Sequence, residues 1–209
     1  SGIDKVHFGL EAAVSIPIYH TLALNGAVSW GQYTYDSNPY YLQTQDNSGD
    51  IVSDGYVYWK DFRVESTPQT AVNVGLSWRS NNNIYLSADF NYYNNMYLSM
   101  SPIYRTDAVI TGGMAPGDIE HLRRQEKFDS AYTLNASIGK NWYIHRKYTL
   151  GFSLDVKNIL NNQDIKTGGY EQTRLSKNTE TTVTTYQAFD SKYFYMFGTT
   201  YYLNLYFRF

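Results

Sequence analysis

The nine residues Tyr201-Tyr202-Leu203-Asn204-Leu205-Tyr206-Phe207-Arg208-Phe209 are the most informative stretch of this 209-residue chain. Its odd positions are tyrosine, leucine or phenylalanine, whereas its even positions are tyrosine, asparagine and arginine. Because successive side chains of a strand point to opposite faces, this period of two predicts a β-strand with one apolar, aromatic-rich face and one polar face. The pattern is typical of the closing strand of a membrane β-barrel, whose outer face meets lipid.

Composition excludes several other classes of protein. The chain has 17 Lys+Arg against 19 Asp+Glu, spread evenly, which argues against a basic nucleic-acid-binding surface. No apolar run approaches the roughly 18 residues of a transmembrane helix, so an α-helical membrane protein is excluded. A β-barrel is compatible with the mean hydropathy of -0.47, because alternating strands average apolar with polar residues. The absence of cysteine excludes disulfides and thiolate metal sites.

Aromatic residues are abundant, with 22 Tyr, 10 Phe and 4 Trp. Aromatic girdles at the two interfaces of a membrane would use many of these rings. Composition alone fits equally well a tyrosine-rich soluble β-sandwich or a carbohydrate-binding module.

The alternation of the last strand recurs in six earlier segments, at residues 7–16, 21–30, 72–79, 84–93, 132–139 and 148–157. The connections alternate in length. Short links at 17–20, 80–83 and 145–147 follow the first, third and fifth segments. Long links at 36–69, 100–129 and 161–198 follow the second, fourth and sixth. This order predicts an all-β, antiparallel meander, a transmembrane barrel segment with short periplasmic turns and long extracellular loops. A sandwich with Greek-key connections is not expected to alternate short and long connections in this way.

The distribution of charge supports the same architecture. No central position of the apolar face is charged. The charged residues of the predicted strands all fall on the polar face, and they are Glu11, Arg79, Asp89, Asp155, Lys157 and Arg208. A charge facing hydrocarbon at mid-membrane costs a few kcal/mol, whereas a polar lumen accepts it. The aromatic residues are expected in two girdles: Tyr19, Trp78, Trp142, Tyr148, Phe207 and Phe209 near the short turns, and Trp30, Tyr33, Tyr92 and Tyr97 near the long loops.

The sequence predicts seven strands, an odd number, whereas bacterial single-chain barrels have an even number of strands. The chain is therefore expected to be the C-terminal portion of a larger barrel. A small eight-stranded barrel remains an alternative if 51–67 holds another strand. We interpret residues 55–64 as an extension of the third strand, and the threonine-rich run 179–185 as a β-extension in the last loop.

Two motifs resemble those of TonB-dependent outer-membrane receptors. Leu154-Asp155-Val156-Lys157-Asn158-Ile159-Leu160-Asn161-Asn162 resembles their penultimate-strand motif, apolar-x-Val-x-Asn-Leu-(Phe/Leu)-(Asn/Asp). Residues 198–209 resemble their closing strand, although Thr199 replaces the usual arginine. The stretch from Thr67-Pro68 to Val74-Gly75-Leu76-Ser77-Trp78 is similar to the family's Pro and later Gly-Leu-x-Tyr. Residues 96–106 resemble the SusC-related branch.

The resemblance implies a 22-stranded barrel with a plugged lumen, of which residues 1–209 form roughly the last third, without the plug and earlier strands. It implies active import of a nutrient (siderophore, cobalamin, glycan or peptide) across the bacterial outer membrane with TonB-coupled energy. The implied partners are the rest of the barrel and its plug, the TonB complex, the barrel-assembly machinery, outer-membrane lipid or lipopolysaccharide, and a surface lipoprotein. The assembly signal is then expected in Tyr201, Leu203, Leu205, Phe207 and Phe209.

Catalytic and metal sites are not expected. The four histidines lack metal-site spacing, and no nucleotide, hydrolase or metalloprotease motif is present, so we predict no enzyme activity, no metal and no cofactor. Ligand contacts are expected in the long loops. Aromatic rings stack on planar ligands or sugars, and arginine pairs with phosphate, so the candidates are Tyr40, Tyr41, Tyr58, Trp59, Tyr104, Arg123 and Arg124.

Three alternatives stay open at this stage. A passive outer-membrane channel or small structural barrel would need no plug. A soluble tyrosine-rich β-sheet binding module would need no membrane. An outer-membrane enzyme would need a catalytic motif.

Overall fold

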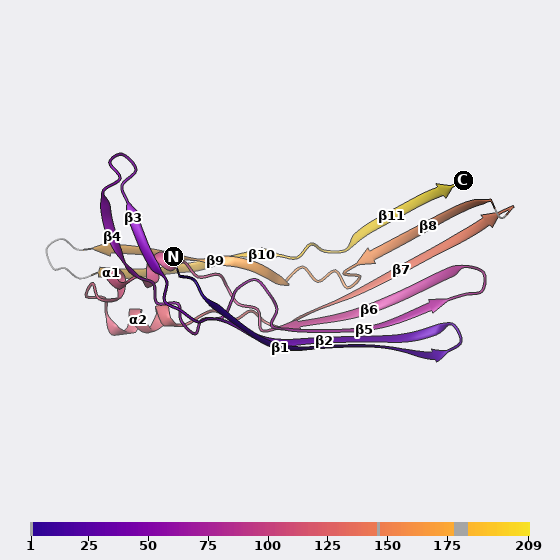
Figure 1. Cartoon of the computed structure of the whole chain (residues 1–209), viewed down its shortest axis with the longest axis horizontal. Coiled ribbons are helices and arrows are strands. Elements are labelled where there is room, and N and C mark those ends of the chain that lie inside the picture. Colours follow the sequence, from indigo (N-terminus) through magenta and orange to yellow (C-terminus); the bar gives the residue numbers. More distant parts are fainter. Residues whose placement is uncertain (1, 146, 178–183) are drawn as a thin grey trace.

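Seven strands form one open antiparallel sheet in the computed structural model, which describes residues 2–145, 147–177 and 184–209 (Figure 1). The strands are β1 (Lys5–Tyr19), β2 (Leu22–Tyr35), β5 (Thr70–Arg79), β6 (Ile84–Asn94), β7 (Ala131–Ile144), β8 (Tyr148–Lys157) and β11 (Thr200–Arg208). They lie side by side in the order β1-β2-β5-β6-β7-β8-β11, and each strand pairs with its neighbours in this order. The predicted seven-strand antiparallel meander is therefore confirmed.

The long connections hold the other helices and strands of the described residues and gather at the end of the sheet opposite the short turns (Figure 1). The first contains the hairpin β3 (Tyr40–Thr44) and β4 (Ile51–Tyr56). The second contains η1 (Pro102–Arg105), α1 (Asp107–Ile110) and α2 (Pro116–Arg123), and the third contains the hairpin β9 (Lys166–Lys177) and β10 (Thr184–Tyr195). None of the helices in the described part of the chain has the length and hydrophobicity that a membrane-spanning helix requires.

The interpretation of residues 55–64 was wrong in part. Residues 51–56 pair with β3 in a separate hairpin and add no eighth strand to the main sheet within the described residues. Residues 63–69 do lie beside the C-terminal end of β2, where the Val64 amide donates to the Tyr33 carbonyl at 2.9 Å. The run 179–183 lies outside the described residues, and Thr184 and Thr185 begin β10.

The first short link was also misplaced. Strand β1 continues through Pro17 to Tyr19, and only His20 and Thr21 form the turn. Proline lacks an amide proton and is therefore tolerated mainly in edge strands. β1 lies at the edge of the described sheet, and its register with β2 shifts between Pro17 and Tyr19.

The pairing register is staggered along the sheet. One row of paired apolar residues crosses six strands: Leu22, Trp78, Leu86, Ile138, Leu154 and Leu203. At the first turn, Leu22 of this row pairs with Tyr19, and this is the last pair before the turn residues His20 and Thr21. Between β7 and β8, three further same-face pairs follow it, ending at Ile144 and Tyr148. The turns are therefore displaced along the strands from one strand pair to the next.

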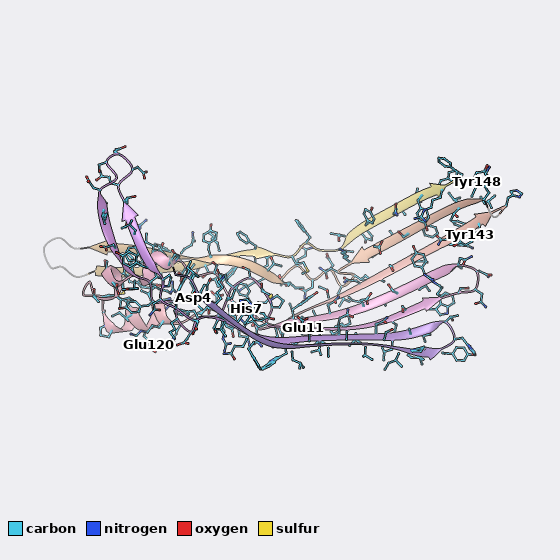
Figure 2. All side chains as sticks on the ribbon, viewed as in Figure 1. Asp4, His7, Glu11, Glu120, Tyr143 and Tyr148 are labelled. Atoms are coloured by element: carbon cyan, nitrogen blue, oxygen red, sulfur yellow. The ribbon has the colours of Figure 1, made fainter. Side chains whose placement is uncertain are left out.

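The buried core of the chain lies at the loop end and not in the sheet. Its hydrophobic members are Tyr35, Val57, Met96, Leu98, Met100, Met114, Leu122, Phe128, Ala131 and Ile165. None comes from the middle of the seven-strand sheet, whose side chains project from both faces without a second layer over them (Figure 2). The apolar face stays exposed, with Leu205 at 71 %. Such a face needs a covering, because each buried leucine stabilises by about 1.5–3 kcal/mol.

Candidate functional site

The polar face of the sheet carries a hydrogen-bonded ladder of small polar side chains. Asn25 accepts from Ser15 at 2.8 Å and donates to Ser77 at 3.1 Å. Further along the sheet, Asn73 donates to Asn91 at 2.9 Å. These bonds run from strand to strand across the same face, so the two faces of the sheet differ in chemistry as the alternation predicted.

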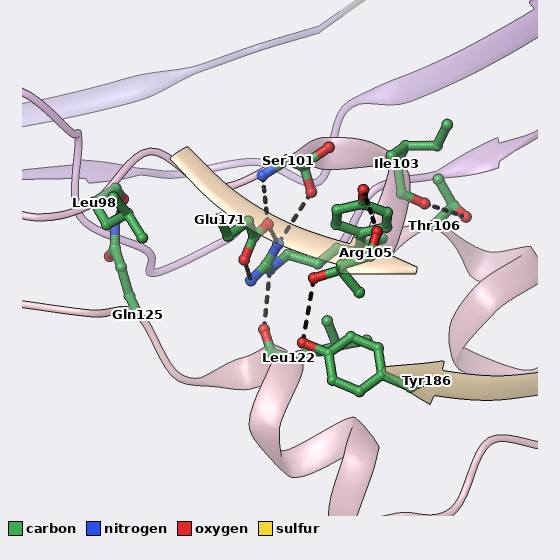
Figure 3. Close-up of polar contacts among 11 residues, drawn as sticks. Leu98, Ser101, Ile103, Arg105, Thr106, Leu122, Gln125, Glu171 and Tyr186 are labelled. Atoms are coloured by element: carbon green, nitrogen blue, oxygen red, sulfur yellow. Dashed lines mark hydrogen bonds and ion pairs between the residues drawn. The ribbon is translucent and has the colours of Figure 1, made fainter. Parts of the chain in front are cut away.

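Arg105 joins the three long connections (Figure 3). Its side chain is 2 % exposed, and its Nε donates to the Leu122 carbonyl at 2.9 Å. Nη1 and Nη2 both bind the Glu171 carboxylate, the latter at 2.9 Å, and Nη1 also donates to the Ser101 carbonyl. The guanidinium lies 5.6 Å from the ring of Phe62 in the first connection.

This buried pair was missed by the sequence analysis, which considered only exposed basic residues. Arg105 and Glu171 are 66 residues apart, and no local pattern marks either one. A bidentate arginine–carboxylate pair with its other donors satisfied is geometrically specific. Because Arg105 contacts residues of all three long connections, the Arg105–Glu171 pair holds these connections together.

A cavity of about 760 Å³ lies between α2, β9 and β10. Its lining combines polar and aromatic side chains, among them His121, Arg124, Gln172, Tyr186, Phe189 and Asp190. Strand β10 bulges here, since Asp190 and Ser191 together oppose Glu171, and both line the cavity. In a regular strand two successive residues would face opposite ways, so the bulge directs both toward the same space.

Hydrogen bonds and burial perturb two tyrosines of this cavity. The Tyr193 hydroxyl donates to Glu126 at 2.7 Å, and this bond raises the pKa of Tyr193 above its ordinary value. Lys166 acts in the opposite direction, with its ammonium 3.7 Å from the ring centroid of Tyr193. Burial raises the pKa of Tyr186, which lies 5.5 Å from the ring of His121. Both hydroxyls therefore stay protonated and can donate hydrogen bonds at neutral pH.

The tyrosines predicted to bind ligand mostly bond to the loops themselves. Tyr40 donates to the Asp54 carboxylate, and Tyr41 and Ser53 share a hydrogen bond of 2.7 Å, both across the β3–β4 hairpin. The Tyr104 hydroxyl donates to the Thr173 carbonyl at 2.8 Å and so links the second connection to the third.

Tyr58 and Trp59 follow the β3–β4 hairpin. A hydrogen bond to Asp107 raises the pKa of Tyr58. Trp59 stacks on Tyr35 with ring centroids 4.6 Å apart, and its buried Nε1 has no hydrogen-bond partner within the described residues.

The predicted basic pair ends helix α2. Arg124 pairs with Glu120 at 2.6 Å and lines the 760 Å³ cavity, whereas Arg123 is exposed. Tyr104 lines a second cavity, of about 1030 Å³, and Tyr41 a third, of about 410 Å³. The structure thus brings the seven predicted ligand residues to one end of the molecule without gathering them in a single site.

The terminal strand has the exposure that its pattern predicted. Tyr201, Leu203, Leu205, Phe207 and Phe209 share one exposed face, and the rings of Phe207 and Phe209 stack 6.3 Å apart. One edge of β11 pairs with β8, and the other has no partner within the described ranges. In contrast, Tyr33 was wrongly assigned to an outer girdle. It shares the polar face with Gly31 and stacks on His7 at 4.8 Å.

The motif at residues 154–162 forms a junction where β8 leaves the sheet. Asn158 is buried at φ 51°, and its Nδ2 donates to the Asn162 carbonyl at 2.9 Å and the Phe197 carbonyl at 3.1 Å. Its amide donates to Asn135 on β7, and its carbonyl accepts from Thr199. Two features thus explain the asparagine. Its backbone is left-handed, a conformation that asparagine tolerates, and its hydrogen bonds connect β7, β8 and the segment that leads into β11.

Within the described residues, no group of three or more histidine, aspartate or glutamate side chains is arranged to hold a metal ion. No protein-family model matches the chain, and no curated protein matches it.

Proposed function

We propose that this chain forms part of the wall and the outer loops of an outer-membrane β-barrel transporter of the TonB-dependent class, which imports a nutrient into a bacterial cell. The observation that carries this proposal is the pairing of one exposed apolar face with one hydrogen-bonded polar face across seven staggered strands. In a membrane barrel the first face meets hydrocarbon and the second a wet lumen.

A soluble protein would have to cover the apolar face with a second layer. The described helices and hairpins extend beyond the end of the sheet and do not lie over that face (Figure 1). The rings of Trp78, Trp142, Tyr148 and Phe207 stand on the apolar face toward the short turns, which suits the interface of a bilayer. These features favour a lipid covering over a missing protein layer.

The loop end supports transport over a purely structural role. Arg105 holds its connections together, and the second and third of them line open cavities of about 760 and 1030 Å³ with mixed polar and apolar walls, which is the size range of small-molecule sites. Energy coupling through TonB, the plug, the remaining strands and a surface lipoprotein are proposed from the resemblance of residues 154–162 and 198–209.

Single-cysteine labelling tests the location of the two faces, because this chain holds no native cysteine. The full-length protein would carry Leu203→Cys, Asn204→Cys, Leu205→Cys or Tyr206→Cys, one at a time, in native membranes. A lipid-soluble maleimide is expected to label positions 203 and 205, and a water-soluble one positions 204 and 206. Equal water-soluble labelling at all four positions, in a protein that stays dispersed without detergent, would instead support the soluble module.

Conductance separates an active transporter from a passive channel. The purified full-length protein in a planar bilayer with KCl is expected to show no steady current, because a plug fills the lumen. A stable open current that persists in every preparation would contradict active import and favour the passive channel.

A further inference from the structure

Lys140 is the one charged residue on the apolar face of the seven strands within the described residues. Strand β7 runs to Ile144, five residues beyond the predicted end of this segment, and so carries Lys140 onto that face. Its side chain is half-buried. An isolated cation on a face of leucine, valine and phenylalanine needs an explanation.

Among the described residues, Lys140 forms no ion pair with a carboxylate. Its cross-strand partners on the same face are Ile84 in β6 and Phe152 in β8, both apolar. Along its own strand the same-face neighbours are Ile138 and Trp142, and the ammonium lies 5.2 Å from the centroid of the Trp142 ring. Because β7 is flanked on both sides by paired strands, a further strand cannot bring a carboxylate beside it.

The position of Lys140 corresponds to the boundary of the bilayer. Ile84, its partner, is the first strand residue after the turn at 80–83. Trp142 lies closer to the turn end, and Figure 2 places Tyr143 and Tyr148 at the tip of the β7–β8 pair. A lysine facing lipid is costly at mid-membrane but nearly neutral at the interface, where its long stem lets the ammonium reach the head groups.

We propose that Lys140 and Trp142 form a binding site for the phosphate of an anionic phospholipid on the outside of the sheet; the proposal rests on the membrane location proposed above. The ammonium donates hydrogen bonds to the phosphate, and the indole packs at the head-group level. The acyl chains pass over the apolar row of Leu86, Ile138 and Leu154, which crosses β6, β7 and β8 next to Lys140 on the side away from the turn. Charge complementarity and this row together select a phospholipid over a soluble anion.

Quenching of Trp142 fluorescence by brominated lipids tests the site. The full-length protein is reconstituted with phosphatidylcholine carrying increasing fractions of brominated phosphatidylglycerol or brominated phosphatidylcholine, and the Trp142 signal is the difference between the native protein and Trp142→Phe. The native protein is expected to prefer phosphatidylglycerol about fivefold, the effect of one lysine near a membrane surface. Lys140→Gln should abolish the preference and Lys140→Arg should keep it. Lys157→Gln, on the polar face of β8, is the matched control and should keep it too.

Each other outcome has a distinct meaning. Equal quenching by both lipids in the native protein would overturn the lipid site and leave the membrane wall standing. No quenching by either lipid would contradict the membrane wall itself. Loss of the preference in Lys157→Gln as well as Lys140→Gln would overturn the site, because overall charge would then explain the effect.

Discussion

The ring of Tyr85 on β6 lies directly over Gly139, its paired residue on β7, and occupies the space that a side chain at position 139 would need. A Cβ there would clash with the ring. Gly151 on β8 and Tyr206 on β11 repeat the arrangement, and the Tyr206 hydroxyl also donates to Asn141. An aromatic ring over a glycine covers exposed backbone and fixes the pairing register, since a slip would move the ring off the gap.

Gly139→Ala should lower the free energy of unfolding by about 1–3 kcal/mol, the usual cost of overpacking. Tyr85→Ala in the same chain should recover part of that loss by removing the clash. Urea unfolding of the full-length protein in detergent would measure both. Gly117→Ala is the control, because a Cβ at 117 meets nothing within 4 Å. Equal stability of Gly139→Ala and the native protein would show that the ring does not fill this space.

Arg105→Met should loosen the loop end and leave the sheet intact. Removing one partner of a buried ion pair costs about 3–5 kcal/mol, because the other charge stays buried without compensation. Limited proteolysis should therefore cut within 100–129 or 161–198 at least tenfold faster than in the native protein. Arg105→Met/Glu171→Met should be less sensitive than Arg105→Met alone. Arg124→Met, which breaks an exposed pair, is the control and should be cut at the native rate.

Asn158→Ala should destabilise through two separable effects. The φ of 51° costs a non-glycine, non-asparagine residue about 1–2 kcal/mol, and each lost side-chain hydrogen bond about 1 kcal/mol. Asn158→Gly keeps the backbone and loses only the bonds, so it should fall between the native protein and Asn158→Ala in urea unfolding.

Asn83 isolates the backbone effect, since its φ is 58° in an exposed turn. Asn83→Ala should show the cost of the left-handed conformation alone, and Asn83→Gly should be neutral. If Asn158→Gly were also neutral, the side-chain bonds of the motif would not matter for stability.

Phe209→Ser should reduce the amount of assembled protein in the outer membrane more than it changes ligand affinity, as expected if the last strand is an assembly signal. Phe209 is 93 % exposed and stacks on Phe207. Phe197→Ser is the matched control, since Phe197 is 83 % exposed but precedes β11, whereas Phe209 directly follows its last residue. Quantitative blotting of the membrane fraction would compare them. A native yield of Phe209→Ser would exclude this residue from the signal.

The sheet was predictable because its signal is local. Alternation within ten residues is enough to define a strand and its two faces, and the contrast between short and long links gives the meander. The prediction failed where the alternation was interrupted. Lys140 ended the apparent apolar pattern of its segment, and Pro17 suggested a turn, yet both lie within strands because their neighbours hold them in the ladder.

The sequence by itself determined the seven strands, their order and the separation of apolar from polar faces, since these depend on a period of two and on link length. Only the tertiary structure decided the contents of the loop end. The pairing of Arg105 with Glu171, the bulge at Asp190 and the isolation of Lys140 depend on contacts between residues distant in the chain or on neighbouring strands. Such contacts leave no local pattern, because each partner is an ordinary polar residue until the fold brings the other beside it.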